Sequence, residues 1–146
     1  MIIPDANILL YAYVPSFKEH KNAKKWLEIL LSDNKEVVGL AWQTITAFLR
    51  IGTNPRIFQK PFQITEAEKR LNQLFSHPLV QTVVPTEKHW RIFSEILREE
   101  QITADLVMDA HLAALAIEHN AAIATTDRDF LRFSKIVKII NPLKSK

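Results

Sequence analysis

The sequence of 146 residues lacks cysteine and has only two glycines. Without cysteine there is no disulfide, thiolate zinc site or thiol nucleophile, which is typical of a cytosolic protein. There is no phosphate-binding glycine loop and no nucleophile-elbow serine. No apolar run approaches the roughly 18 residues that a membrane helix needs. The N-terminus has an acid, Asp5, and no basic residue before it, unlike a signal peptide. We therefore expect a soluble, cytoplasmic protein that does not bind membranes.

Net charge is also small, at +3, with 24% of residues charged and 47% hydrophobic. This composition is typical of a globular protein, and the length fits a single domain over residues 1–146. The small positive charge permits nucleic-acid binding but does not establish it. From Arg128 to Lys146 there are six basic residues and one acid, Asp129. This stretch is either a solvated C-terminal edge or a strip that contacts phosphates.

Short apolar segments alternate with segments of helical periodicity along the chain. Thr65 is expected to cap one helix, with Glu68 three residues later completing a capping box. The alternation predicts an α/β fold with a twisted, mainly parallel sheet of about five short strands flanked by helices. In such a sheet, ligands bind beyond the carboxyl ends of the strands. The expected strands are residues 1–4, 36–40, 80–84, 121–125 and 136–140. The expected helices are residues 7–14, 18–32, 42–52, 65–76, a segment that begins at residue 86, and 104–120.

Asp5 follows the first expected strand and therefore lies at the predicted mouth of the site. It is either an N-cap for the next helix, where aspartate is favoured, or a functional carboxylate. Asn7, two residues later, either hydrogen-bonds Asp5 and holds its carboxylate in place or makes an Asx-turn. Neither residue alone decides between a structural and a functional role.

Asp109 is harder to explain as a structural residue. It is expected inside the helix of residues 104–120 rather than at either end, and the alanines around it make that helix slim. Small residues allow close packing, so we expect Asp109 to be partly buried. A buried carboxylate is costly unless it is paired or bound to a metal. Asp105, one turn earlier, is either a second contributor or a first-turn acid that the helix dipole favours.

Two further acids, Asp127 and Asp129, follow the expected strand of residues 121–125. Aspartates are common in turns, so local structure explains each of them taken singly. However, Asp5, Asp109 and Asp127 are all predicted at one end of the sheet, where three ionised carboxylates would repel one another. A hard divalent cation such as Mg²⁺ relieves that repulsion and supports phosphodiester hydrolysis. The five histidines show no metal-ligand spacing and are expected on the surface or in packing.

The motifs together resemble the PIN-domain family. The segment from Pro4 to Ala12 looks like the opening of these domains, Asp109 to Ala116 is similar to their DAxxAA helix, and Thr125 to Phe130 resembles their TxDxDF turn. More narrowly, the segments Phe48 to Phe58 and Asn141 to Leu143 look like a VapC-type toxin subgroup. The resemblance spans nearly the whole chain, with the motifs in the family's order and spacing.

This resemblance implies a PIN-like fold and a Mg²⁺- or Mn²⁺-dependent endoribonuclease that cuts RNA as the toxin of a toxin–antitoxin pair. It also implies a homodimer and a small cognate antitoxin whose tail occupies the acidic groove. The catalytic and metal-binding acids carried over by the resemblance are Asp5, Asp109 and Asp127. The remaining carried-over residues are Asp129 as an auxiliary metal-binding acid, with Asn7 and Thr126 as orienting residues. We expect RNA phosphate contacts from Arg50, Arg56, Arg128 and Arg132, although Arg50 alternatively pairs with an acid of the site.

The sequence departs from the family at one position. Many members carry a glutamate on the third helix where this chain has Ala47, and Gln43, one turn earlier, binds Mg²⁺ more weakly than a carboxylate does. This departure supports an alternative function, a catalytically weak binding module for RNA or a partner peptide. Phosphatases of the haloacid-dehalogenase kind also begin with an aspartate after a strand. They need the pattern DxDx[TV], however, and the segment Asp5 to Leu9 lacks its second aspartate and its threonine.

Overall fold

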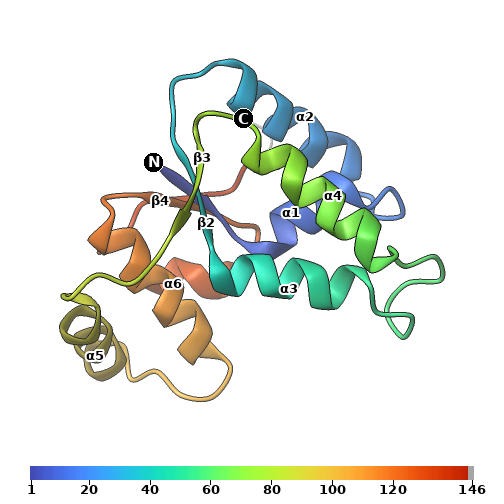
Figure 1. The fold of residues 1–146 in the computed structure, drawn as a ribbon. Helices are drawn as coiled ribbons and strands as arrows, with labels where there is room; N and C mark the ends of the chain where they lie inside the picture. The colour runs from blue at the N-terminus through green and yellow to red at the C-terminus, as the bar shows by residue number, and fades with distance from the viewer. Residues whose placement is uncertain (145–146) are drawn as a thin grey trace.

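The computed structural model describes residues 1–144 and has the predicted α/β architecture (Figure 1). Lys146, the last residue of the basic C-terminal stretch, lies outside the described residues. The sheet has five parallel strands in the order β3-β2-β1-β4-β5. The strands are β1 (Ile2–Pro4), β2 (Val38–Ala41), β3 (Val80–Val83), β4 (Ala122–Ala124) and β5 (Ile139–Ile140).

Helices cover both faces of this sheet, and a separate apolar core lies under each layer. The helices are α1 (Ala6–Tyr13), α2 (His20–Ser32), α3 (Trp42–Gly52), α4 (Ile64–Phe75), α5 (His89–Glu99), α6 (Leu106–Glu118) and the 3₁₀ helix η1 (Arg128–Phe133). One core joins helices α1 to α4 to the sheet around Phe48 and Leu40, and the other joins α5, α6 and η1 to it around Leu112 and Phe133. In Figure 1 the α5–α6 pair accordingly lies apart from α2 and α4.

The middle of helix α6 is buried because its sequence there is apolar. The five residues from Leu112 to Ala116 are all buried, and a helix that is apolar on every side has no solvent face to keep. Three of them are alanines, whose small side chains let the helix pack closely. Among residues 1–144, no helix is long and apolar enough to cross a membrane.

The order of the strands places a crevice beside β1. The chain starts in the middle of the sheet, adds β2 and β3 on one side of β1, and then crosses over to add β4 and β5 on the other side. Ligands of open parallel sheets bind at such a reversal, beyond the carboxyl ends of the strands. Asp5 directly follows β1, and its backbone N–H donates to the carbonyl of Ala124, the last residue of β4 (2.9 Å). The reversal therefore brings the residues that follow β1 and β4 together.

Several of the expected element boundaries were wrong. Helix α4 starts one residue before Thr65, and its cap is Gln63, whose backbone N–H donates to the Glu66 carboxylate at 3.4 Å. Helix α5 starts at His89 rather than at Thr86. Strand β5 has only two residues, because Val137 lies in the turn that follows η1 and its backbone N–H donates to a carbonyl of that helix.

Candidate active site

Three carboxylates meet beyond the carboxyl ends of the strands. One side-chain oxygen from each of Asp109, Asp127 and Asp129 lies within 4.8 Å of the other two. Asp127 caps η1, with its Oδ1 accepting from the Asp129 N–H at 2.9 Å, so the turn after β4 itself brings these two acids together. Asp109 lies in the first turn of α6 rather than in the helix interior, so its predicted position was wrong. It is half-buried, as expected. Asp105 precedes α6 and is exposed.

Asp5 lies beside this cluster rather than in it. Its Oδ1 accepts from the backbone N–H of Ala6 (2.8 Å), and its Oδ2 accepts from the Thr125 hydroxyl (2.9 Å). The N-cap interpretation of Asp5 is therefore confirmed. Asp5 also lies near the other acids, and its negative charge therefore helps to raise the pKa of Asp109. The tight group differs from the expected trio, because Asp129 replaces Asp5 in it.

Burial and neighbouring negative charges disfavour the ionised form of Asp109. Burial, together with the charges of Asp127, Asp5 and Asp129, raises the pKa of Asp109 to about 6, although Arg132 opposes the shift. Burial also raises the pKa of Asp5, against the hydrogen bonds that it accepts. Hard carboxylate oxygens at this spacing are suitable ligands for Mg²⁺ or Mn²⁺, and a cation there would remove the repulsion.

Two threonines follow β4 at the site, and only Thr126 was predicted from the sequence to orient the acids. Asn7 Nδ2 donates to the Thr126 hydroxyl at 3.1 Å, so Asn7 neither holds Asp5 nor makes an Asx-turn. Thr125 is 2% exposed, and its hydroxyl donates to Asp5 while accepting from the Asp127 N–H at 3.0 Å. Thr125 thus links the two acids that follow β1 and β4. A hydroxyl at the buried end of an apolar strand was the available signal for it.

A groove of about 380 Å³ runs along α3 beside the acids. Ala47 and Arg50 line it together with Asp5 and Asp109, so position 47, where the family resemblance leads us to expect a glutamate, does face this groove. Gln43 lines the same groove, but its polar atoms already have partners on α6. Its amide donates to the carbonyl of Met108 (3.2 Å), and its oxygen contacts His111 Nδ1 (2.7 Å).

The three other arginines expected to contact RNA phosphates differ in how close they lie to the acids. Arg132 is close enough to lower the pKa of Asp109. Arg128 lines a second groove, on the far side of Asp127. Arg56 is exposed in the loop after α3 and lines neither groove. The structure therefore brings Arg50, Arg128 and Arg132 near the acids and leaves Arg56 outside.

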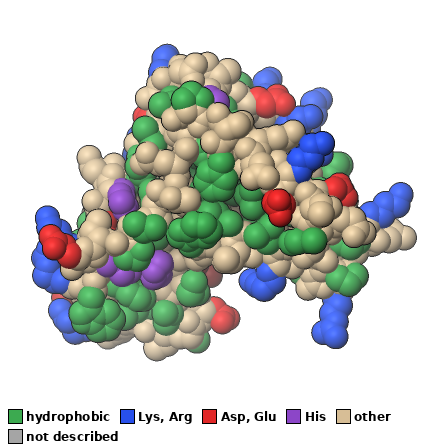
Figure 2. Space-filling model, viewed as in Figure 1, with side chains coloured by type: hydrophobic (Ala, Val, Ile, Leu, Met, Phe, Trp, Pro, Cys, Tyr) green, Lys and Arg blue, Asp and Glu red, His purple; other side chains and the backbone are tan. Residues whose placement is uncertain are grey.

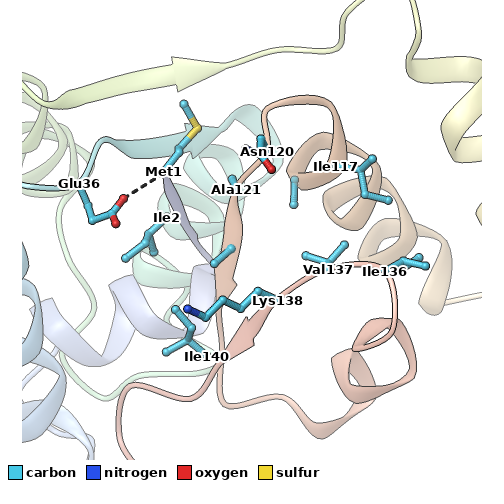
Figure 3. Close-up of a pocket in the computed structure, with 12 residues that line it drawn as sticks. Met1, Ile2, Glu36, Ile117, Asn120, Ala121, Ile136, Val137, Lys138 and Ile140 are labelled. Carbon is cyan, nitrogen blue, oxygen red and sulfur yellow. Dashed lines mark hydrogen bonds and ion pairs between the residues drawn. The ribbon is translucent and has the colours of Figure 1, made fainter.

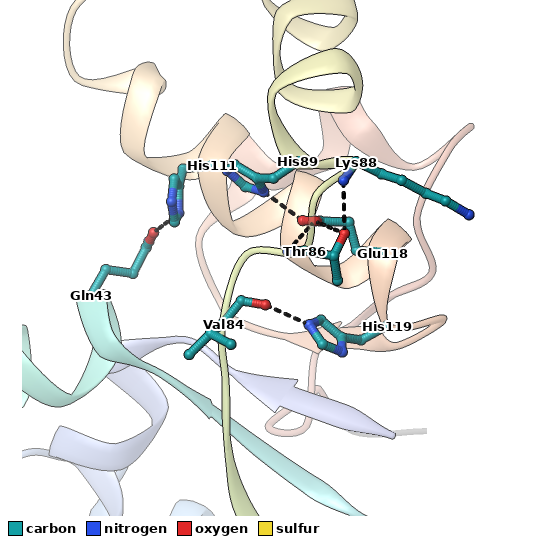
Figure 4. A network of polar contacts seen from close by, with 8 residues as sticks. All are labelled: Gln43, Val84, Thr86, Lys88, His89, His111, Glu118 and His119. Carbon is teal, nitrogen blue, oxygen red and sulfur yellow. Dashed lines mark hydrogen bonds and ion pairs between the residues drawn. The ribbon is translucent and has the colours of Figure 1, made fainter.

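A histidine network connects α5 to α6 near the site (Figure 4). The carboxylate of Glu118 accepts from the Thr86 backbone and hydroxyl, and it pairs with His89. Burial would raise the pKa of Glu118, but the hydrogen bonds from His89 and Thr86 outweigh it and lower the pKa. The His89 ring packs against His111, with 4.7 Å between centroids, and His111 meets Gln43. These histidines serve packing, as predicted from the sequence.

A further pocket, of about 400 Å³, opens at the opposite end of the sheet (Figure 3). It is lined by residues that precede strands, including Met1, Glu36 and Lys138, and the amino group of Met1 pairs with Glu36 at 3.0 Å. Parallel sheets bind ligands at the carboxyl ends of their strands. This pocket is therefore not the candidate site.

Known proteins match the chain over most of its length. Residues 2–136 match the family described as PIN domain. Ribonuclease VapC37 of Mycobacterium tuberculosis is 39% identical over 136 residues, which are 93% of this chain and 94% of that protein. Ribonuclease VapC33 of the same organism is 33% identical over 144 residues, 99% of each chain. The structure of VapBC2 from Rickettsia felis bound to a promoter DNA fragment gives a TM-score of 0.67 at 18% identity, over 97% of this chain and 98% of that one. This last likeness confirms the predicted fold.

Proposed function

Because the chain belongs to the PIN-domain family, we propose that it is a metal-dependent endoribonuclease that acts as a VapC-like toxin. The observation that carries the proposal is the convergence of Asp109, Asp127 and Asp129 beyond the carboxyl ends of the strands. In this proposal residues 1–146 form one nuclease domain that acts in the cytoplasm. Its catalytic acids are Asp5, Asp109 and Asp127.

The residues present fit a divalent cation, Mg²⁺ or Mn²⁺. Asp109, Asp127 and Asp129 would hold it, with Asp5 beside them, since carboxylate oxygens are the ligands these ions prefer. When bound, such an ion supplies an activated water and charge neutralisation at the scissile phosphate.

The other side chains of the site position the acids and the RNA. Thr125 fixes the Asp5 carboxylate and the Asp127 backbone through its hydroxyl, and Asn7 with Thr126 supports the same turn. Arg50 and Arg132 carry positive charge beside the acids, so they are suited to orient the phosphate.

The proposed partners are an RNA substrate, a small cognate antitoxin and a second copy of the chain. Support for the antitoxin comes from structural neighbours that are toxin–antitoxin complexes, such as VapBC2. The proposal of an RNA substrate is supported by relatives named ribonucleases. In this proposal the antitoxin neutralises the nuclease at the acidic groove.

The test is cleavage of a mixed pool of structured RNA by the purified protein in Mg²⁺, in Mn²⁺ and in EDTA. Cleavage should need the metal, and EDTA should abolish it. Mn²⁺ should also raise the Tm of the wild type, since a ligand that binds only the folded state stabilises it. Asp127→Asn should remove both effects, whereas the control Asp105→Asn, at an exposed acid outside the cluster, should keep both. Metal-independent cleavage, or none under any metal, would contradict the proposal.

Ala47 supports the second candidate function, a binding module with weak catalysis. If the missing carboxylate limits metal binding, Ala47→Glu should raise Mn²⁺ affinity about tenfold, because it adds an acid to the groove shared with Asp5 and Asp109. Calorimetric titration with Mn²⁺ measures this affinity, and RNA cleavage should rise in parallel. The control Ala47→Gln adds similar bulk without charge and should leave Mn²⁺ affinity unchanged. Equal affinity of the glutamate and glutamine variants would show that this position does not face the metal.

A further inference from the structure

We propose that the second groove, on the β4–β5 side of the acids, is a subsite for the single-stranded RNA that continues beyond the scissile phosphate. This inference rests on the proposed nuclease function. It adds the location of the RNA on one side of the bond that is cut. We define this groove as the β5 groove, lined among others by Tyr11, Arg128, Leu131, Asn141 and Lys144.

The β5 groove opens directly from the acid cluster. Thr126 and Asp127 line it, so one wall of the groove is the turn that carries an acid of the site. Asn141, which also lines it, is the residue directly after β5. The groove therefore lies at the same carboxyl edge of the sheet as the acids. With a volume of about 670 Å³ it is larger than the groove along α3, at about 380 Å³.

The two grooves flank the acids from opposite sides. The groove along α3 is lined by Asp5, after β1, and by Gln43, after β2, whereas the β5 groove follows β4 and β5. With the order β2-β1-β4-β5, the carboxyl edge from one groove to the other spans three strand intervals, about 14 Å. An endonuclease must accommodate its substrate on both sides of the bond that it cuts. The sheet order supplies one groove for each side.

The chemistry of the β5 groove fits a single strand of RNA. Arg128 and Lys144 are exposed cations on its wall, suited to phosphates. Leu131, 54% exposed, and Tyr11 offer apolar and aromatic surface for unpaired bases. Glu19 is the other acid besides Asp127 that lines the groove. Figure 2 shows Lys and Arg side chains dispersed around the outline of the molecule. The face seen in that view therefore has no broad basic patch that could bind RNA in place of the groove.

The experiment compares RNA affinity of the wild type with that of the double variant Arg128→Gln/Lys144→Gln. A labelled mixed-sequence single-stranded RNA of about 16 nucleotides is titrated in EDTA, which prevents metal-dependent cleavage, at about 50 to 200 mM salt. The matched control is Lys69→Gln/Lys88→Gln, which also removes two exposed cations but touches neither groove. All four side chains are exposed, so neither double variant is expected to unfold.

The double variant should weaken RNA binding about tenfold and reduce the slope of log affinity against log salt by about 1.4, the value for two lost contacts to a single strand. In Mg²⁺, KM for RNA should rise more than kcat falls, and the control should behave as the wild type. If the wild type cleaves RNA but the double variant binds RNA as tightly as the wild type does, the inference is wrong. A partner peptide would then be the better candidate for the β5 groove. If the wild type neither binds nor cleaves RNA, the proposed function fails as well.

Discussion

Asp109→Asn is expected to lower kcat for RNA cleavage by about 10³-fold or more while making the metal-free protein more stable. The loss follows because Asp109 is one of three acids within 4.8 Å, and an amide is a weaker, neutral ligand. The gain follows because ionised Asp109 is half-buried and repelled by Asp127, Asp5 and Asp129. After allowance for solvent screening of this partly exposed group, we expect about 1 kcal/mol, or about 2–4 °C in Tm.

The pH dependence has a definite sign. The pKa of Asp109 is about 6 in the folded protein against 3.8 for the ordinary group, so between these values the folded state binds more protons than the unfolded state. This contribution therefore makes stability fall as pH rises from about 4 to about 6, and Asp109→Asn should remove it. Thermal unfolding in EDTA across this range measures the difference between the two proteins. An inactive but less stable Asp109→Asn, beside an unchanged Asp105→Asn, would mean that Asp109 supports the fold rather than the reaction.

Thr125→Val should lower kcat by about 10- to 100-fold, the range typical of residues that orient metal ligands. Valine keeps the shape of the side chain, but Asp5 loses the hydroxyl that donates to it, and the Asp127 N–H loses its acceptor. The unfolding free energy should fall by about 1–3 kcal/mol, because buried polar groups are left without partners. Steady-state cleavage and denaturant unfolding measure the two effects.

Two further substitutions separate the effect of the Thr125 hydroxyl on the acids from the effect of Thr125 packing. Thr125→Ser retains the hydroxyl and should restore most of the cleavage rate, although it removes a buried methyl group. Thr126→Val, at a residue whose hydroxyl accepts from Asn7 rather than contacting an acid, should cost less activity than Thr125→Val. If the serine variant is as slow as the valine variant, packing at this position determines the rate and the hydroxyl does not.

The sequence predicted the elements whose signals are local and periodic. Helix α3 has the predicted bounds, Trp42 to Gly52, because its apolar residues repeat at helical spacing and Thr53 to Pro55 break the pattern. The parallel sheet also followed from the alternation of short strands and helices. The convergence of Asp109 and Asp127 was predictable from the rule that ligands bind beyond the strand ends.

What the sequence did not predict depends on tertiary contacts. Asp129 rather than Asp5 belongs to the tight group, and Asp5 accepts hydrogen bonds from Ala6 and Thr125 that periodicity cannot show. Gln43 was expected to be a weaker metal ligand than a carboxylate, but the sequence does not show that its amide donates to Met108, 65 residues later in the chain. The buried pair of His89 and Glu118 likewise joins two helices that only folding brings together.

The parallel pairing of β1 with β4 also determines when the acid cluster can form during synthesis of the chain. Ile2 pairs with Ala122, so β1 gains this neighbour only after β4 has been synthesised. A nascent chain acquires Asp5 well before it acquires Asp127 and Asp129. In the proposed function, a nascent chain that still lacks β4 and η1 therefore cannot assemble the acid cluster and cuts no RNA. An antitoxin that is already present can bind the nuclease once these two elements have been added and the site has formed.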